Sequence, residues 1–366
     1  MRGLTELVFS TTNQCNARCR DCPVVSIKNL PARLKPEVMM RVVDEVSGWG
    51  ALRLVVFTGG ESFLLGKELY KTVADVAKKR IRTRIVSNGY WASSREKAVE
   101  VLGELKALGL SELNISCDDF HQEFIPLANV KNANDAAREI GIPLLLVHRR
   151  KPGGKITVEY LSEYLGVDLH LFRKGEKNPD NDVISTNRNL PLYTSSDGPD
   201  SEPWELPEND SDWTGACDSV LRNIVIASDL NVHICCGIAE MTIPELSVGS
   251  LLENDLITIL QHGNQDLIVN WLALEGPSSI LSFVRSEDPS IKFSEHYVNR
   301  CHLCHELFTR ADVRRVLAKS ASKRADSLML MRGALDWISE DWAVNPESKA
   351  RAYSSLTAAN LLEPGL

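Results

Sequence analysis

The sequence lacks any apolar run of the ~20 residues that a helix needs to cross a bilayer. Its opening residues, Met1 to Thr5, lack the apolar core of a secretory signal peptide. Positive charge is also scarce: 41 lysines and arginines against 49 aspartates and glutamates give a net charge of -8. Nothing therefore indicates a protein devoted to nucleic-acid phosphates. We expect a cytoplasmic protein with no membrane partner, for which a nucleic-acid partner is unsupported.

A short β-branched apolar run, a polar turn and a helical pattern alternate from residue 6 to about residue 173. The runs predict six strands at 6–11, 52–58, 83–87, 112–116, 143–147 and 167–172. The segments between them predict helices at 35–47, 66–79, 94–108, 128–140 and 158–165. Such alternation implies parallel strands joined by right-handed crossovers. Six units are too few for an eight-stranded barrel, so we predict an α/β fold with a partial (β/α)6 TIM-like barrel over residues 1–175.

The second half of the chain has a different character. Ten acidic residues and five prolines fall in residues 176–212, which predicts an acidic, proline-rich linker over 176–213, or a lid over the barrel mouth. Runs at 222–227 and 232–236 flank a turn and predict a β-hairpin within a small α+β module over 214–310. A helix is expected at 256–274, and further helices over 311–366.

Polar side chains follow the predicted strands, at the barrel end where enzymes of this shape carry their chemistry. This rim comprises Cys15 to Cys22, Gly59 to Glu61, Ser87 to Gly89, Asp118 to His121, His148 to Arg150, and Arg173. Asp119 and His121 are candidate catalytic residues, because a substrate proton could be handled there. A supporting role for these two side chains is the alternative.

Three cysteines crowd into eight residues of the first rim loop. Cys15, Cys19 and Cys22 can wrap three thiolates round one compact metal centre, and thiolates select zinc, copper(I) or iron-sulfur. Three ligands leave one position open to another molecule, whereas structural zinc sites are closed by four. A zinc site would need a fourth ligand, and no histidine lies nearby in sequence.

This loop, together with the turn Gly59-Gly60-Glu61, resembles the radical S-adenosylmethionine (SAM) superfamily over roughly residues 5–173. The resemblance implies that Cys15, Cys19 and Cys22 hold a [4Fe-4S] cluster whose open iron chelates SAM. It also implies that the turn offers its backbone and Glu61 to the methionine amino group. The remaining implied contacts with SAM are ribose and carboxylate contacts at Ser87, Asn88, Ser116 and Asp118, and a carboxylate pair with Arg149 or Arg173.

One position departs from that pattern. The family usually has an aromatic residue just before the third cysteine, near the adenine, and this chain has Asp21 there. The adenine contact is therefore unassigned. Cys117, which follows the fourth strand, is expected to be a small buried filler.

Five cysteines in the second half form another group: Cys217, Cys235, Cys236, Cys301 and Cys304. They resemble the auxiliary-cluster modules called twitch or SPASM domains, although they are too few for the double-cluster form. One auxiliary [4Fe-4S] cluster fits, with Cys217, Cys235, Cys301 and Cys304 as ligands. Cys236 is the spare, because neighbouring strand residues point to opposite faces. A zinc site using His302 or His305 is the alternative.

The resemblance implies an enzyme that cleaves SAM reductively to a 5'-deoxyadenosyl radical and abstracts a hydrogen atom from its substrate. The electron would come from a flavodoxin- or ferredoxin-type donor. We expect a ribosomally made peptide to be oxidised, cross-linked or epimerised. The alternative substrate is a small molecule such as an amino sugar or amino acid, and the alternative class is a non-catalytic iron-sulfur or zinc protein.

Overall fold

The computed structural model describes residues 3–19, 22, 32–149, 151, 153–171, 183–187, 213–237, 243–295, 297 and 299–344. For residues 171, 183–187 and 336–344 it describes the backbone alone. The strands form one ten-stranded sheet in the order β10-β9-β8-β1-β2-β3-β4-β5-β7-β6.

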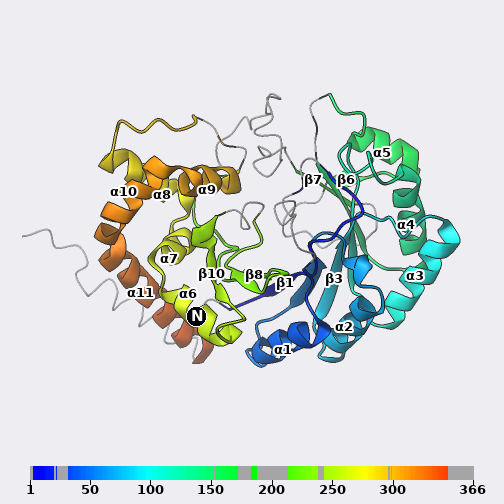
Figure 1. Cartoon of the computed structure of the whole chain (residues 1–366), viewed down its shortest axis with the longest axis horizontal. Helices are drawn as coiled ribbons and strands as arrows, with labels where there is room; N and C mark the ends of the chain where they lie inside the picture. Colours follow the sequence, from blue (N-terminus) through cyan, green and yellow to red (C-terminus); the bar gives the residue numbers. More distant parts are fainter. Residues whose placement is uncertain are drawn as a thin grey trace, which may run out of the picture.

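The first half of the chain supplies five consecutive parallel strands of this sheet. They are β1 (Glu6–Ser10), β2 (Leu54–Thr58), β3 (Arg82–Ser87), β4 (Glu112–Ser116) and β5 (Leu144–Arg149). The connecting helices are α1 (Pro36–Ser47), α2 (Lys67–Lys78), α3 (Arg95–Ala107) and α4 (Leu127–Ile140), with α5 (Val158–Leu165) after β5. Figure 1 shows α1 to α5 on the outer side of the curved sheet. The predicted partial barrel is confirmed.

Local capping explains where these helices begin and end. Ser94 and Thr157 accept hydrogen bonds from the third backbone N–H of α3 and α5. Gly141 and Gly166 end α4 and α5 in the left-handed conformation that glycine adopts without strain. These signals are local, so the sequence could place the helices.

The sixth barrel strand differs from the prediction. β5 pairs in parallel with β7 (Val183–Asn187), which lies in the stretch expected to be a linker or lid. The expected strand at 167–172 is only β6 (His170–Leu171), and it pairs with β7 at the edge of the sheet. Residues 183–187 include three β-branched residues, a strand signal that the acidic charge of the longer segment had obscured. The other residues of the expected linker, up to 212, lie outside the described ones.

The predicted hairpin is present, and it extends the barrel sheet. β8 (Asn223–Ile226) pairs antiparallel with β9 (Asn231–His233) and parallel with β1. β10 (Ser247–Ser250) then adds to β9. The second half of the chain is therefore joined to the barrel through continuous backbone hydrogen bonding along β1.

Helices surround this end of the sheet (Figure 1). They are α6 (Leu256–Gln265), α7 (Leu267–Leu274), α8 (Pro277–Glu287), α9 (Arg300–Thr309), α10 (Ala311–Ser320) and α11 (Ala325–Val344). Short 3-10 turns lie at Ser62–Leu65, Pro244–Leu246 and Ala321–Arg324. The single helix expected at 256–274 is divided, because Asp266 accepts a hydrogen bond from Val269 N (2.9 Å) and caps α7.

Apolar side chains of both halves form one core. Phe9 and Phe57 stack beneath the barrel rim, and Trp271 and Tyr297 are fully buried in the second half. Among the described residues, no single helix has the length and apolar composition to cross a membrane. Only α7 and α8 taken together, with a 115° bend between them, meet that requirement.

Candidate active site

The first cysteine loop follows β1 at the carboxyl end of the sheet. Cys19 is buried, Cys22 is partly buried and Cys15 is exposed. Ala17 N donates to Cys15 Sγ (3.4 Å), and Cys22 N donates to Cys19 O (3.2 Å). Arg20 and Asp21 lie outside the described residues. The loop therefore brings all three predicted thiols to one end of the barrel.

The turn Gly59-Gly60 supports the backbone that leads into this loop. Gly60 N donates to Thr12 O (2.6 Å), and Glu61 N donates to Gln14 O (2.8 Å). A Cβ on Gly60 would lie 2.0 Å from Gln14 O, and one on Gly59, whose φ is +122°, would lie 2.6 Å from Thr12 O. In this structure the glycines are needed for close approach to the chain's own backbone. The contact with a cofactor that the resemblance implied stays a prediction.

Glu61 lies just after β2, within a network of hydrogen bonds. Its side chain is fully buried and accepts hydrogen bonds from Ser87 Oγ (2.9 Å), Asn88 N (2.8 Å) and Phe63 N (3.1 Å). Burial raises the pKa of Glu61 to about 7, although these hydrogen bonds act in the opposite direction. The carboxyl group therefore joins the ends of β2 and β3. The contact with the methionine amino group that the resemblance implied stays a prediction.

Ser87 and Asn88 complete this network. Ser87 Oγ also accepts from Gly89 N and Trp91 Nε1, both at 3.0 Å. Asn88 Nδ2 donates to Asn16 Oδ1 (2.8 Å) and lies 3.7 Å from Cys15 Sγ. Because the Asn88 backbone is bound to Glu61, the network connects the buried carboxyl group to the first cysteine. The implied ribose contacts of Ser87 and Asn88 stay predictions.

Asp118 and His121 form a hydrogen-bonded pair on the β4 side of the rim. Asp118 Oδ1 is 2.8 Å from His121 Nδ1 and also accepts from the backbone of Phe120 and His121. Burial opposes the charge of Asp118, but the hydrogen bond and charge of His121 keep its pKa below the ordinary value. Burial likewise opposes the charge of His121, yet Asp118 and Cys19 together hold its pKa well above the ordinary value.

Two further predicted residues lie on the same rim. Arg149, at the end of β5, donates its backbone N–H to Asp118 Oδ2 (3.3 Å), and Ser116 ends β4 in register with Val147. Both side chains are partly buried. The structure therefore brings Asp118, His121 and the Arg149 backbone together, with Ser116 on the same rim.

Asp119 makes hydrogen bonds to the backbone of a neighbouring rim loop. Its oxygens accept from Lys155 N (2.8 Å) and Ile156 N (3.1 Å), just before α5. The carboxylate thus ties the loop after β4 to the loop after β5. Carboxylates commonly cap backbone N–H groups in this way. Asp119 therefore positions the rim loops, and the catalytic role expected for it stays a prediction.

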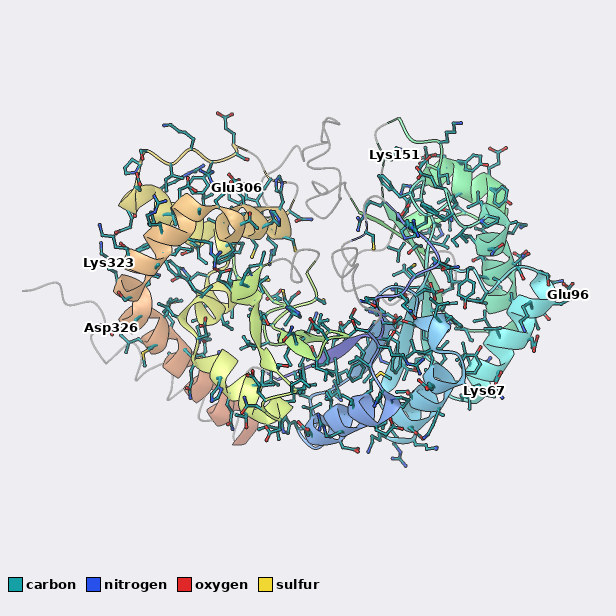
Figure 2. The ribbon with its side chains drawn as sticks, in the orientation of Figure 1. Lys67, Glu96, Lys151, Glu306, Lys323 and Asp326 are labelled. Carbon is teal, nitrogen blue, oxygen red and sulfur yellow. The ribbon has the colours of Figure 1, made fainter. Side chains whose placement is uncertain are left out.

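Sequence reasoning missed one aromatic neighbour of the cysteine loop. Phe120 is buried and packs with Ala17, Cys19 and Cys22. Lys151, labelled in Figure 2, lies over its ring with Nζ 5.4 Å from the centroid. Phe120 is the one aromatic residue in the rim motif Asp118 to His121, so the sequence contained the signal. Its position against the loop depends on the pairing of β4 with its neighbours.

The second cysteine group surrounds a cavity of about 30 Å³. Cys217 precedes β8, Cys235 follows β9, and Cys301 and Cys304 lie one turn apart on α9. All four predicted thiols line the cavity, together with Val220, Gly237, Ile243, Leu246, Leu272, Pro277 and Arg300. Cys236 is exposed and is not among these lining residues, as expected for the spare cysteine.

The geometry around this cavity is tight. Asn299 caps α9 by accepting hydrogen bonds from Cys301 N (3.0 Å) and His302 N (3.1 Å). A Cβ on Gly237 would lie 3.3 Å from Cys301 Sγ and 3.5 Å from Cys235 Sγ. Burial and the like charges of Cys301 and Cys217 raise the pKa of the Cys304 thiol well above its ordinary value. Thiols in this setting favour a partner that stabilises the thiolate.

The histidines of the zinc alternative do not line the cavity. His302 packs edge-on against Tyr297 (5.2 Å between centroids), and His305 is buried beside Thr309. Burial, with the charge of His302, lowers the pKa of His305 to about 4. In the described part of the chain, no three His, Cys, Asp or Glu side chains are arranged about one metal ion. A [4Fe-4S] cluster instead uses four thiolates, and four thiols within apolar walls fit that donor set.

Comparison with known proteins identifies the class of the barrel. Residues 9–150 match the family model described as the radical SAM superfamily. This match contains the three-cysteine loop, the Gly59-Gly60-Glu61 turn and the rim residues up to Arg149. The barrel formed by these residues is therefore a radical SAM domain.

Individual relatives differ in how much of the chain they share. The putative peptide biosynthesis protein YydG of Bacillus subtilis (strain 168) is 24% identical over 306 residues, which covers 82% of this chain and 91% of YydG. GTP 3',8-cyclase 2 of Pseudomonas aeruginosa is 28% identical over 207 residues, covering 54% of this chain and 61% of the cyclase. Among solved structures, native anSMEcpe with bound AdoMet and the Cp18Cys peptide is 14% identical. It covers 89% of this chain and 99% of that chain, with a TM-score of 0.48.

Proposed function

We propose that this radical SAM enzyme modifies a ribosomally made peptide by oxidation, cross-linking or epimerisation, and that its second half holds one auxiliary [4Fe-4S] cluster. The observation that carries the peptide assignment is the extent of the similarity to YydG. That similarity covers 82% of this chain, whereas the similarity to GTP 3',8-cyclase 2 covers 54%. The relative named for peptide biosynthesis thus shares far more than a barrel-sized segment.

The donor sets fit the clusters that the family uses. Cys15, Cys19 and Cys22 would hold the cluster that binds SAM, and the four cysteines lining the second cavity would hold the auxiliary one. When bound, these groups supply the electron that cleaves SAM to methionine and a 5'-deoxyadenosyl radical, and an acceptor for a substrate electron. The protein contributes binding, orientation and exclusion of side reactions.

The chain's own residues prepare the barrel rim. The Gly59-Gly60 turn fixes the backbone before Cys15. The side chain of Asn88 lies beside Cys15 Sγ and fixes that side of the loop. Asp118 orients the ring of His121 through Nδ1, so Nε2 of the ring is directed away from Asp118. Asp119 holds the adjoining loops together. Arg149 is the cation at this end of β5 that could pair with a carboxylate of SAM or substrate.

The cellular location and the electron donor follow from the proposed chemistry. We propose a cytoplasmic location, where a flavodoxin- or ferredoxin-type protein can deliver low-potential electrons. The family assignment argues against the non-catalytic alternative. A small molecule such as an amino sugar or amino acid is the competing substrate. Because some relatives are named GTP 3',8-cyclase, GTP should also be compared with peptides as a substrate.

The test compares substrates on one preparation of reconstituted enzyme. Short peptides encoded beside this chain's gene, GTP, and free amino acids or amino sugars are each incubated with SAM and dithionite. The proposal predicts that one peptide accelerates 5'-deoxyadenosine formation and is itself changed, by loss of hydrogen mass or by inversion of a residue found on chiral hydrolysate analysis. Turnover of GTP or a free amino acid with no response to peptides would contradict it.

A further inference from the structure

The cavity that the four cysteines line is also lined by an ionisable residue that is not a cysteine. Among the described residues that line it, Arg300 is the one side chain with a permanent charge. The remaining lining residues are apolar or glycine. Arg300 is the first residue of α9, immediately before Cys301. A permanent cation is thus placed at the edge of a site built from thiolate ligands.

Arg300 also joins two of the segments that supply the thiols. Its Nη1 donates to Ala216 O (2.6 Å), and its Nη2 donates to Thr214 O (3.3 Å). Ala216 precedes Cys217, so the guanidinium links the helix that carries Cys301 and Cys304 to the loop that carries Cys217. A guanidinium is suited to this task because its planar fork presents several donors in fixed directions.

The loop before Cys217 is held on its other side by backbone contacts. Cys217 N donates to Leu272 O (3.0 Å) at the end of α7. A Cβ on Gly276 would lie 1.8 Å from Gly215 O, which shows how closely the loop packs against the turn between α7 and α8. Arg300 therefore adds a side-chain contact to a segment that main-chain contacts also hold.

We propose that Arg300 is a positioning residue that also sets the reduction potential of the auxiliary cluster. The inference rests on the proposed presence of that cluster. One-electron reduction adds one negative charge to the cluster and its thiolates, and a fixed cation at the cavity edge stabilises the reduced state. Walls of valine, isoleucine, leucine and proline exclude water there, and charge interactions are stronger where water is excluded.

The potential of an iron-sulfur centre depends on nearby charge and hydrogen bonding as well as on its ligands. Removing the guanidinium charge should therefore make the auxiliary cluster harder to reduce. Lysine keeps the charge but, as a compact ammonium group, cannot reproduce the planar fork to two carbonyl groups. The two roles of Arg300 thus predict different results for glutamine and lysine at this position.

The experiment uses the full chain in which Cys15, Cys19 and Cys22 are replaced by alanine, so that the auxiliary cluster alone gives the signal. Arg300→Gln, Arg300→Lys and Arg315→Gln are made in this background. Arg315 is exposed on α10, is not among the lining residues, and provides the same loss of charge as a matched control. Iron content is measured first, and midpoint potentials are then measured by EPR-monitored titration with dithionite.

Arg300→Gln should lower the reduced-to-oxidised ratio at a fixed potential about tenfold, which is a shift of about 59 mV to more negative potential for one electron. Arg300→Lys should shift it by less than half as much while altering the EPR line shape, and Arg315→Gln should leave both unchanged. Equal potentials in the Arg300→Gln and Arg315→Gln chains would overturn the proposal.

Two other outcomes are also decisive. If Arg300→Gln binds no iron, the lysine variant decides: a retained cluster near the parent potential supports the role of the charge, and loss of iron in both variants limits Arg300 to folding and overturns the potential-setting role. If the parent triple variant itself binds no iron, the auxiliary cluster of the proposed function fails. That failure is recognised before Arg300 is changed.

Discussion

The N-terminal cysteines come from a single loop of eight residues after β1, whereas the C-terminal cysteines come from three segments that meet only in the folded module. The first loop is supported by hydrogen bonds from the Gly59-Gly60 turn and by the network of Glu61, Ser87 and Asn88. The second site is enclosed by apolar side chains. One site is therefore specified by local backbone geometry, and the other by packing between distant parts of the chain.

This contrast predicts that the two sites can be removed separately. The largest effect is expected for Cys217→Ala or Cys304→Ala, each of which removes a thiol from the shared cavity. Iron should fall from about eight to about four per reconstituted chain, because each cluster contains four. 5'-Deoxyadenosine should still form, while modified product should be lost. Metal analysis and chromatography measure both quantities.

The outcome also separates the cluster from zinc. About four irons together with about one zinc in the unaltered chain would identify a zinc site instead. Full iron in both single variants would leave the cavity cysteines without the cluster that we assign to them.

The contrast between local backbone geometry and packing of distant segments also explains which features the sequence could predict. The barrel helices and the cysteine loop depend on spacing, caps and short motifs, so most of β1 to β5 and all three N-terminal thiols were predictable. β7 was missed because its five residues lie within an acidic stretch, and it becomes a strand by pairing with β5. The division at Asp266 was missed because a cap interrupts a continuous apolar pattern.

The rim residues show most clearly that the sequence does not reveal contacts between residues far apart in the chain. Glu61 and Asp119 were correctly placed on rim loops, but, apart from Phe63 next to Glu61, the hydrogen-bond partners named for them lie 26 to 37 residues away in sequence. Sequence spacing alone could not show that their oxygens accept hydrogen bonds from the protein itself. The four auxiliary cysteines were identified by residue type, although only the structure shows that they line a common cavity.

The next effect in size concerns the buried carboxyl group of Glu61. Its pKa in the folded chain, about 7, lies above the ordinary value of 4.5. The folded state therefore binds the proton more tightly, and the stabilisation is fully present below about pH 4.5 and lost as the pH rises through about 7. The free energy of unfolding of the original chain relative to Glu61→Gln should fall by roughly 3 kcal/mol across this range.

Urea unfolding of the two chains, compared between about pH 5 and about pH 8 without clusters, measures most of this difference. Glutamine is the matched replacement because it keeps the shape of the side chain without titrating. A difference that grows with pH would mean that the hydrogen bonds to Glu61 outweigh the cost of burying its charge.

A smaller effect is expected for the carboxylate between the rim loops. Asp119→Ala should lower the free energy of unfolding by about 1–2 kcal/mol, because Lys155 N and Ile156 N lose their acceptor. Its yield of 5'-deoxyadenosine per folded molecule should remain within about threefold of the original, a change of less than 1 kcal/mol in activation energy. Normal stability with a loss of turnover would instead support the catalytic role of Asp119.

The smallest effect is expected for Cys236, the exposed member of two adjacent cysteines. Cys235 is buried and lines the cavity, and Cys236 is exposed. Cys235→Ala should therefore reduce the auxiliary iron, and Cys236→Ala should leave the iron content nearly unchanged. Matched reconstitutions of the two variants make the comparison, and the reverse order would exchange the ligand assignment.

The most direct test of the account is the yield of 5'-deoxyadenosine from the chain in which Cys15, Cys19 and Cys22 are all replaced by alanine. With SAM and dithionite present, this variant should form none, while it retains about four irons bound to the cavity of the second half. Continued formation of 5'-deoxyadenosine by the triple variant would contradict the assignment of SAM cleavage to the N-terminal cysteine loop.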